Sequence, residues 1–469
     1  MEWGRPKRVP HRLTKPRPRR HRTAFGPHPN SRRLMSPHFR SFVLFVLGLA
    51  TTGSPRPTLA DETPLPPDIK GESSAVVPVS VDSEISDNPE AASSPRMSLE
   101  EALEADPEFA SEYERRKQVF SDAKARLADR MLAMRRTWLR FHNGVDKDDD
   151  RRAEYRRQRG ETEEAMDAAF EAALDLMRIG GDVETAQYLL TAVKERFDHD
   201  VYDASTMEAA SRLIDSGQSK VYLFLAAARS AMAVGNVDMA RRLYEAVGLD
   251  NTEDPDRGLM TMASKMADAV TEELRRREFD ADLPRVRFVT SAGDVVIELF
   301  ADDAPSTVAH FMTLVDEGFY DGLDFGQVMP GLLAHTGDPQ GDGFGHSGRF
   351  VFDEAQGVDA RRAALRGTVL MAKIIREDKS FVRNSNSSQF AILFLPALQA
   401  TQDQTVIGRV VEGMNVVSRM RRVDPTAEKE KGSLEVPPDH ILSAEVIRRG
   451  KPLAPPNYVP LPGRAAETR

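Results

Sequence analysis

The sequence predicts a multidomain α + β chain, with an α-helical region over residues 98–283 and a β-barrel over residues 284–450. Two observations support this prediction. In the middle third, apolar residues recur at spacings of three and four, as they do along one face of a helix. After Pro284, short runs rich in β-branched residues alternate with Gly-rich loops. Many short strands with only two helical stretches are typical of a barrel.

The composition is that of a globular protein that can form two or three domains. Of its 469 residues, 40% are apolar and 29% are charged. Residues 1–40 contain 12 Lys and Arg but only one acid, so the remainder has 52 basic and 72 acidic residues and a charge of −20. Such an acidic body makes nucleic acid an unsuitable partner. The absence of cysteine excludes disulfides, thiol catalysis and Cys-based metal sites.

The first 60 residues are interpreted as a basic extension followed by a signal peptide. Residues 41–50 form an apolar run that is too short for a membrane-spanning helix, which needs about 20 residues. Small residues follow, and residues 58–60 form an acceptable cleavage site before Asp61. A start at Met35 would give a compact signal. We expect an exported protein, periplasmic or secreted, with no membrane span after cleavage; an uncleaved anchor is the alternative.

Two further segments are expected to lack a core. Residues 61–97 are rich in Pro, Ser, Glu and Asp without apolar periodicity, which predicts a disordered linker. Residues 451–469 form a Pro-rich tail that we expect to be extended.

The helical region contains a helix-capping motif at its start and a sequence motif that occurs twice. Ser98 and Glu101 form a capping box, and apolar residues from Phe120 to Phe141 predict one long amphipathic helix. The motif at 181–186 recurs at 235–240, with every match offset by 54. This Gly turn before a helix resembles the tetratricopeptide repeat, although that family's period is about 34 residues. The resemblance implies a surface for a protein partner; a bundle that packs only internally is the alternative.

The C-terminal region begins with a predicted hairpin. Residues 286–290 and 295–300 are β-rich and flank a turn. Pro305 is expected to start a helix, a second helix is expected over 412–421, and a last strand is expected around Val446.

Three segments carry a resemblance to a known family. Residues 318–325 read GFYDGLDF, residues 328–333 read VMPGLL and are followed by GDP at 337–339, and residues 384–390 read NSNSSQF. In this order they resemble the cyclophilins, which are peptidyl-prolyl cis-trans isomerases, or rotamases. The resemblance covers 284–450 and implies an eight-stranded antiparallel β-barrel with two helices. It also implies assistance to protein folding at Xaa-Pro bonds, with no cofactor and no metal.

The chemistry of this family sets two requirements. Rotation about an Xaa-Pro bond faces a barrier of about 18–20 kcal/mol, so a catalyst must stabilise the twisted amide, for example with a donor aimed at the prolyl nitrogen. The catalyst must also hold the proline ring in an apolar pocket. The family is understood to use an arginine and a nearby glutamine for the amide. Two phenylalanines, a leucine and a histidine line the pocket beside a tryptophan.

Most of those side chains are replaced in this sequence. The arginine position is Gln327 and the glutamine position is His335, so these two are the candidate catalytic residues. The candidate substrate-binding residues are the other matched positions, namely Phe325, Leu332, Gln389, Phe390, Ala391, Ala400 and Gln404. Leu332 and Ala391 replace phenylalanines, Ala400 replaces the leucine, Gln404 replaces the histidine, and the tryptophan position is Gln399.

These replacements leave two functions open, and the sequence does not decide whether the chain is an active enzyme. The first is an isomerase with weak activity on proline-containing peptide or protein segments. A charge-assisted hydrogen bond is about twice as strong as a neutral one, so the loss of arginine implies a rate lower by about ten- to a hundredfold. The second is a non-catalytic cyclophilin-like peptide-binding module joined to a helical interaction domain.

Other motifs carry no function in this interpretation. The Gly-rich loop at 341–345 lacks the Lys-Ser/Thr of a phosphate-binding loop. Residues 386–388 match a glycosylation sequon but are interpreted as part of a loop that shapes the groove. The histidines show no metal-ligand spacing.

Overall fold

The computed structural model describes residues 98–142, 149–248, 252, 255–280, 282–354, 362–376, 378, 380–398, 403–425 and 437–460. These residues fall within one compact unit. The predictions for the signal peptide, for a start at Met35, for the linker at 61–97 and for Gln399 and Ala400 lie outside them.

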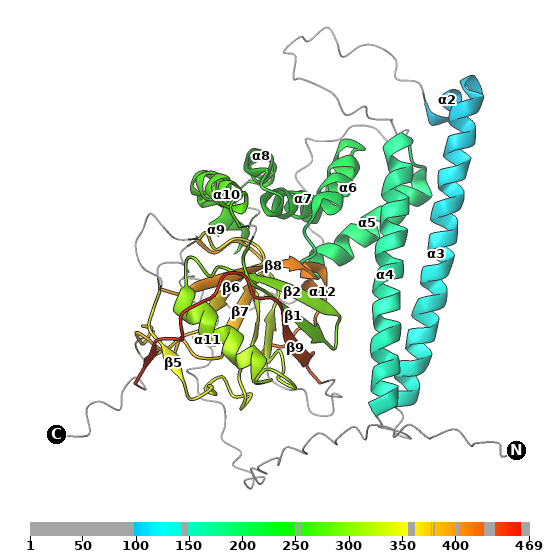
Figure 1. The fold of residues 1–469 in the computed structure, drawn as a ribbon. Helices are drawn as coiled ribbons and strands as arrows, with labels where there is room; N and C mark the ends of the chain where they lie inside the picture. The colour runs from blue at the N-terminus through cyan, green and yellow to red at the C-terminus, as the bar shows by residue number, and fades with distance from the viewer. Residues whose placement is uncertain are drawn as a thin grey trace, which may run out of the picture. The chain divides into compact units, whose positions relative to one another are not determined.

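The helical region opens with a short helix and two long ones. α3 and α4 lie side by side over most of their length, as Figure 1 shows. Within the described part of the chain, no helix is both long and apolar enough to cross a membrane. The helices are α2 (Leu99–Ala105), α3 (Pro107–His142), α4 (Asp149–Ile179), α5 (Val183–Asp198), α6 (Ala204–Asp215), α7 (Val221–Ala233), α8 (Val237–Val247), α9 (Asp256–Thr261) and α10 (Ala263–Arg277).

Both local predictions for the start of this region are confirmed. The backbone N–H of Glu101 donates to the Ser98 hydroxyl at 3.2 Å, and the backbone N–H of Ser98 donates to the Glu101 carboxylate at 2.8 Å. These reciprocal bonds satisfy amides that a helix start leaves free. The long amphipathic helix predicted from Phe120 to Phe141 lies inside α3.

The repeated motif precedes corresponding helices. The side chains of Asp182 and Asn236 act as N-caps of α5 and α8 and accept from the backbone N–H three residues further on, at 2.9 and 3.1 Å. Gly235, which precedes the second cap, has φ of 87°, which glycine adopts without strain. The likeness to tetratricopeptide repeats stays a prediction.

The C-terminal region is an eight-stranded antiparallel sheet, as expected. Its order is β3-β4-β7-β6-β8-β2-β1-β9. The first hairpin is confirmed by the pairing of β1 with β2. The strands are β1 (Arg285–Thr290), β2 (Asp294–Leu299), β3 (Gln327–Met329), β4 (Leu333–Thr336), β6 (Thr368–Met371), β7 (Phe390–Leu393), β8 (Val406–Glu412) and β9 (Ile441–Arg448).

The two edges of this sheet are joined by loops rather than by strands. The backbone N–H of Phe325 donates to the carbonyl of Asp439 at 2.8 Å, and that of Gly322 donates to the carbonyl of Ile441 at 2.8 Å. Residues just before β3 therefore bind residues at the start of β9. This contact curls the sheet towards the expected barrel.

Two helices accompany the sheet, as predicted. α11 (Pro305–Asp316) begins with Pro at its first position. α12 (Met414–Ser418) is shorter than the predicted span of 412–421, because Gly413 at its N-cap is left-handed, with φ of 84°. A Cβ at Gly413 would lie 2.2 Å from the carbonyl oxygen of Asp294. In the tail, β10 (Tyr458–Val459) pairs with β5 (Phe350–Val351), which agrees with an extended tail.

Buried and partly buried salt bridges join the helical region to the sheet. Arg419 donates to Asp167 of α4 at 2.6 and 2.8 Å, and Arg362 donates to Asp280, which follows α10, at 2.6 Å. Arg159 of α4 donates to Asp439 at 2.7 Å. Removing one member of such a pair leaves an uncompensated charge, which is why these contacts hold the two regions together.

Asp200, between α5 and α6, makes the contact nearest to the candidate site. Its two carboxylate oxygens accept from the backbone N–H of Gly331, each at 3.0 Å, and one accepts from Arg422 at 2.7 Å. Its own carbonyl accepts from Ser418 at 3.0 Å. Asp200 is 1% exposed and has φ of 56°, a conformation that Asp and Asn tolerate better than most residues.

We expect Asp200→Ala to lower the free energy of unfolding by about 3–5 kcal/mol, because it removes the carboxylate that accepts from Gly331, Tyr202 and the three-quarters-buried Arg422. Asp200→Asn should lower it less, since Asn tolerates the left-handed backbone and can still accept from Gly331. Urea unfolding followed by circular dichroism measures both changes. Equal midpoints for the unmodified chain and Asp200→Ala would show that this contact does not stabilise the fold.

Candidate functional site

The candidate catalytic residues lie on one row across the sheet. Gln327 on β3 pairs with His335 on β4, which pairs with Ala391 on β7, which pairs with Leu370 on β6. Directly paired residues of antiparallel strands point to the same face of a sheet. The structure therefore brings Gln327, His335 and Ala391 together on one face, as the sequence motif requires.

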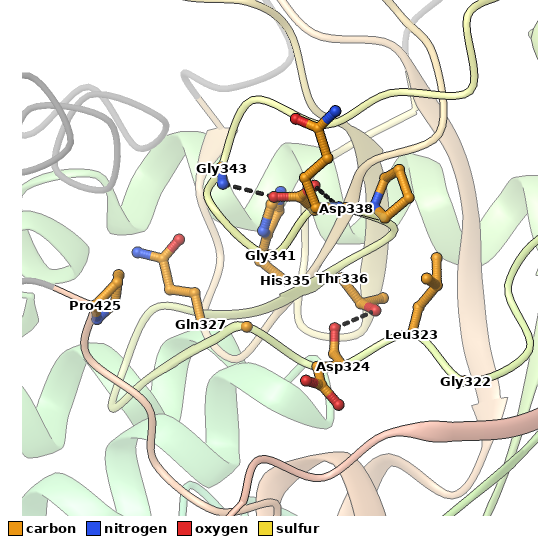
Figure 2. A pocket seen from close by; sticks show the side chains of 13 residues that line it. Gly322, Leu323, Asp324, Gln327, His335, Thr336, Asp338, Gly341, Gly343 and Pro425 are labelled. Carbon is orange, nitrogen blue, oxygen red and sulfur yellow. Dashed lines mark hydrogen bonds between the residues drawn. The ribbon is translucent and has the colours of Figure 1, made fainter. Parts of the chain in front are cut away.

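A pocket opens beside two members of this row. It has a volume of about 170 Å³, and Gln327 and His335 line it together with Asp324, Asp338 and Pro425 (Figure 2). The remaining lining residues are Thr336, at the end of β4, and the loop residues Gly322, Leu323, Gly326, Pro339, Gln340, Gly341 and Gly343. None of these described lining residues is Lys or Arg, whereas two are carboxylates.

The amide nitrogen of Gln327 is a buried donor at this pocket. Gln327 is 1% exposed, and its Nε2 has no hydrogen-bond partner among the described residues. A buried donor without an acceptor is unfavourable by about 1–3 kcal/mol. A ligand carbonyl or amide in the pocket would satisfy it.

Asp338 holds in place a loop that forms one wall of the pocket. Its carboxylate accepts from the backbone N–H of Gln340 at 2.8 Å and from that of Gly343 at 2.5 Å. Figure 2 shows Asp338 beside His335. Gly337, at the start of this loop, has no room for a side chain, since a Cβ there would lie 2.2 Å from the carbonyl oxygen of Ser388.

His335 is neutral at physiological pH. Its side chain is 6% exposed, and burial lowers its pKa from 6.5 to about 4, although Asp338 and Gln389 oppose this shift. Burial also raises the pKa of Asp324. The pocket therefore contains a neutral imidazole and a neutral amide where the family is understood to place an arginine and a glutamine.

Two described members of the expected proline pocket are buried. Ala391 and Gln404 are 3% and 2% exposed, and neither lines the pocket described above. Both amide atoms of Gln404 are buried without a hydrogen-bond partner among the described residues. Leu332 is half-buried and packs against the interior of the barrel. Of the predicted set, the structure thus groups Gln327 and His335 at a pocket and leaves Leu332, Ala391 and Gln404 away from it.

Two predicted substrate-binding phenylalanines are corrected by the structure. The Phe390 ring lies 5.4 Å from the ring of Phe311 and 5.7 Å from that of Tyr320, inside the barrel. Phe325 belongs to the same interior cluster and is 2% exposed. Phe390 neighbours Ala391 along β7 and therefore points to the opposite face of the sheet. Both phenylalanines stabilise the barrel and do not face a substrate.

Gln389 also has a different role in this structure from the predicted one. Its amide Nε2 donates to the carbonyl of Gly345 at 2.6 Å and to that of Gly343 at 3.2 Å. Both of its donors are therefore used to hold the loop beside the pocket. Gln389 positions the wall of the site.

Sequence reasoning did not find the contribution of the helical region to this site. Pro255, which precedes α9, lies against the β3–β4 turn, where a Cβ at Gly331 would be 3.4 Å from its ring. Leu395 and Leu398, on the chain that leads to Ala400, pack with Leu259 of α9. No local motif marks such contacts, because they join residues more than 70 positions apart.

The comparisons with known proteins agree with the fold of the C-terminal region. The model of the family described as "Cyclophilin type peptidyl-prolyl cis-trans isomerase/CLD" matches residues 285–446. The peptidyl-prolyl cis-trans isomerase ppi1 of Schizosaccharomyces pombe is 36% identical over 29% of this chain and 85% of its own length. Peptidyl-prolyl cis-trans isomerase-like 1 of Aspergillus oryzae is 34% identical over 35% of this chain and 97% of its own.

The chain therefore belongs to the family of cyclophilin-type peptidyl-prolyl cis-trans isomerases. Those two matches cover about a third of it, at the C-terminal region. A crystal structure of a Cryptosporidium parvum cyclophilin, determined in the presence of the dipeptide Ala-Pro, is 25% identical over 34% of this chain and 98% of its own, with a TM-score of 0.29.

We expect the buried His335 to make stability depend on pH. Its folded pKa of about 4 lies below its unfolded value of 6.5, so the unfolded state binds the proton first as the pH falls. Above pH 6.5 the neutral His335 makes its full contribution to the free energy of unfolding. As the pH falls towards 4, that free energy declines by up to about 3 kcal/mol. His335→Gln lacks this titration. Urea unfolding at a series of pH values should show a smaller decline for the variant, whereas parallel curves would contradict the assignment.

Proposed function

We propose that the C-terminal region is a peptidyl-prolyl isomerase of reduced activity that acts on proline-containing segments of exported proteins. The observation that supports it most directly is the buried Nε2 of Gln327, a pocket-lining residue, which has no hydrogen-bond partner among the described residues. It stands where the family's arginine is expected, on the same row as His335. Family membership supports the reaction, and the residues at the row support the reduced rate.

The reduced rate follows from the electrostatics of the pocket. As the peptide bond twists, a lone pair localises on the prolyl nitrogen, and a donor at that atom stabilises the twisted state. Gln327 can donate, but it has no charge, and His335 is neutral because burial lowers its pKa to about 4. The carboxylates of Asp324 and Asp338 face the same pocket and do not stabilise a lone pair. A neutral donor therefore lowers the barrier less than a guanidinium would.

Gln327→Arg is expected to raise the isomerisation rate of an Xaa-Pro tetrapeptide by about ten- to a hundredfold. The rate is measured with the full chain against the uncatalysed reaction. Gln340→Arg is the matched control, because it adds the same charge to the pocket lining but not to the row. An unmodified chain with no rate above background would rule out the isomerase.

A non-catalytic binding module is the second candidate, and the buried Ala391 and Gln404 favour it. Both residues belong to the positions expected to hold a proline ring, yet they are 3% and 2% exposed and do not line the pocket. In that case the groove would bind a peptide without isomerising its Xaa-Pro bond. The helical region at 98–283 would bind a second protein partner. Titration calorimetry with matched Xaa-Pro and Xaa-Ala peptides separates the two: equal affinities, together with no catalysis, would establish the binding module.

The proposal that the protein acts on exported proteins depends on residues 41–60. Their apolar run and small residues are those of a cleaved signal, so the mature chain is expected to begin at Asp61. N-terminal sequencing of the chain recovered from an exporting host measures this. A mature chain that begins at Met1 or Met35 would indicate that the signal is retained or absent.

A further inference from the structure

One face of α3 exposes both apolar and basic side chains. Between residues 131 and 140 the exposed positions recur in pairs four residues apart, so they lie on one side of the helix. The apolar members are 51%, 53% and 42% exposed. We call the six exposed residues the α3 face: Met131, Leu132, Arg135, Arg136, Leu139 and Arg140.

This face has no partner in the described part of the chain. α3 packs against α4 and α2, and these contacts use its other sides. Arg130, one position before the face, pairs with Glu161 at 2.5 Å. By contrast, the described residues place no carboxylate within ion-pair distance of Arg135, Arg136 or Arg140. The sequence from 130 to 142 contains no Asp or Glu.

We propose that the α3 face binds the surface of an anionic phospholipid membrane. A helix that lies flat on a bilayer buries apolar side chains at the boundary of the acyl chains and keeps basic side chains at the headgroups. Leucine and methionine are suited to the boundary of the acyl chains. Arginine is suited to the headgroups, because its planar guanidinium binds phosphate through two hydrogen bonds and its long stem reaches outward from the helix.

The chemistry of the face favours a membrane over the other anionic surfaces. A nucleic acid offers phosphates but no apolar layer for three large side chains, and most of this chain is acidic. The face contains no Ser, Thr, Asn or Gln, which would offer a protein partner short side chains with hydrogen bonds of fixed geometry. All six side chains are long and flexible, which suits a fluid surface without fixed hydrogen-bond positions.

Trp138, beside Leu139, gives a local way to test this. The chain has only two tryptophans, so in a Trp3→Phe background the fluorescence reports on α3 alone. Vesicles of phosphatidylcholine and phosphatidylglycerol in equal parts should shift the emission to shorter wavelength. Vesicles of phosphatidylcholine alone should require at least about tenfold more lipid for the same shift, because they lack the anionic headgroups.

Two sets of variants identify the face. Replacing Arg135, Arg136 and Arg140 with Gln should abolish the shift at moderate salt. Replacing Arg115, Arg275 and Arg449 with Gln removes the same charge from positions that are 64–65% exposed elsewhere, and should leave the shift unchanged. Leu132→Ala with Leu139→Ala should weaken it at least about tenfold if apolar contact contributes. Circular dichroism checks that every variant is folded.

The outcomes are decisive in either direction. A shift that the α3 variants remove and the control retains supports membrane binding by this face. The absence of a shift with mixed vesicles overturns the proposal, even if the chain sediments with them through its basic N-terminal residues. An equal loss in both charge variants also overturns it, since binding would then follow net charge alone. If the leucine replacements leave the emission shift unchanged, the proposal is also overturned.

Discussion

The structure depends on buried ion pairs that cross from the helices to the sheet. Asp200 links the α5–α6 turn to Gly331 and Arg422, and Arg362 and Arg419 make comparable contacts elsewhere. Such pairs contribute less net stability than apolar contacts of the same size, but they are specific in geometry and unfavourable to break. The position of the β3–β4 turn is therefore set partly by helices that precede it by more than a hundred residues.

That dependence extends to the site, because the β3–β4 turn connects the strands of Gln327 and His335. The hairpin is held from one side by its sheet neighbour β7 and from the other by Asp200 and Pro255. The pocket beside it is lined by neutral amide and imidazole groups and by two carboxylates. A scaffold shared with the isomerases thus presents a less electropositive surface to its ligand.

Much of the fold could be predicted from sequence, and less of the site. The capping box at Ser98, the hairpin at β1–β2 and the helix from Pro305 each depend on residues close together in the chain. The row of Gln327, His335 and Ala391 followed from a family motif. Phe390 was assigned to the same groove as Ala391, although neighbours along a strand point to opposite faces of a sheet, which the sequence could have indicated. The contacts of Asp200 and Pro255 were missed because no local pattern records a partner so distant in sequence.

The glycosylation sequon at residues 386–388 takes on a different meaning in the folded chain. Asn386 is fully buried, and its amide donates to Thr405 at 3.0 Å. A sugar on that nitrogen would leave no room for the contact with Thr405, so an oligosaccharyltransferase could modify Asn386 only before the barrel closes. In a host that glycosylates exported chains, sugar at this position would mark the molecules that folded too slowly. Glycosylation at this sequon would then report how fast the barrel closes.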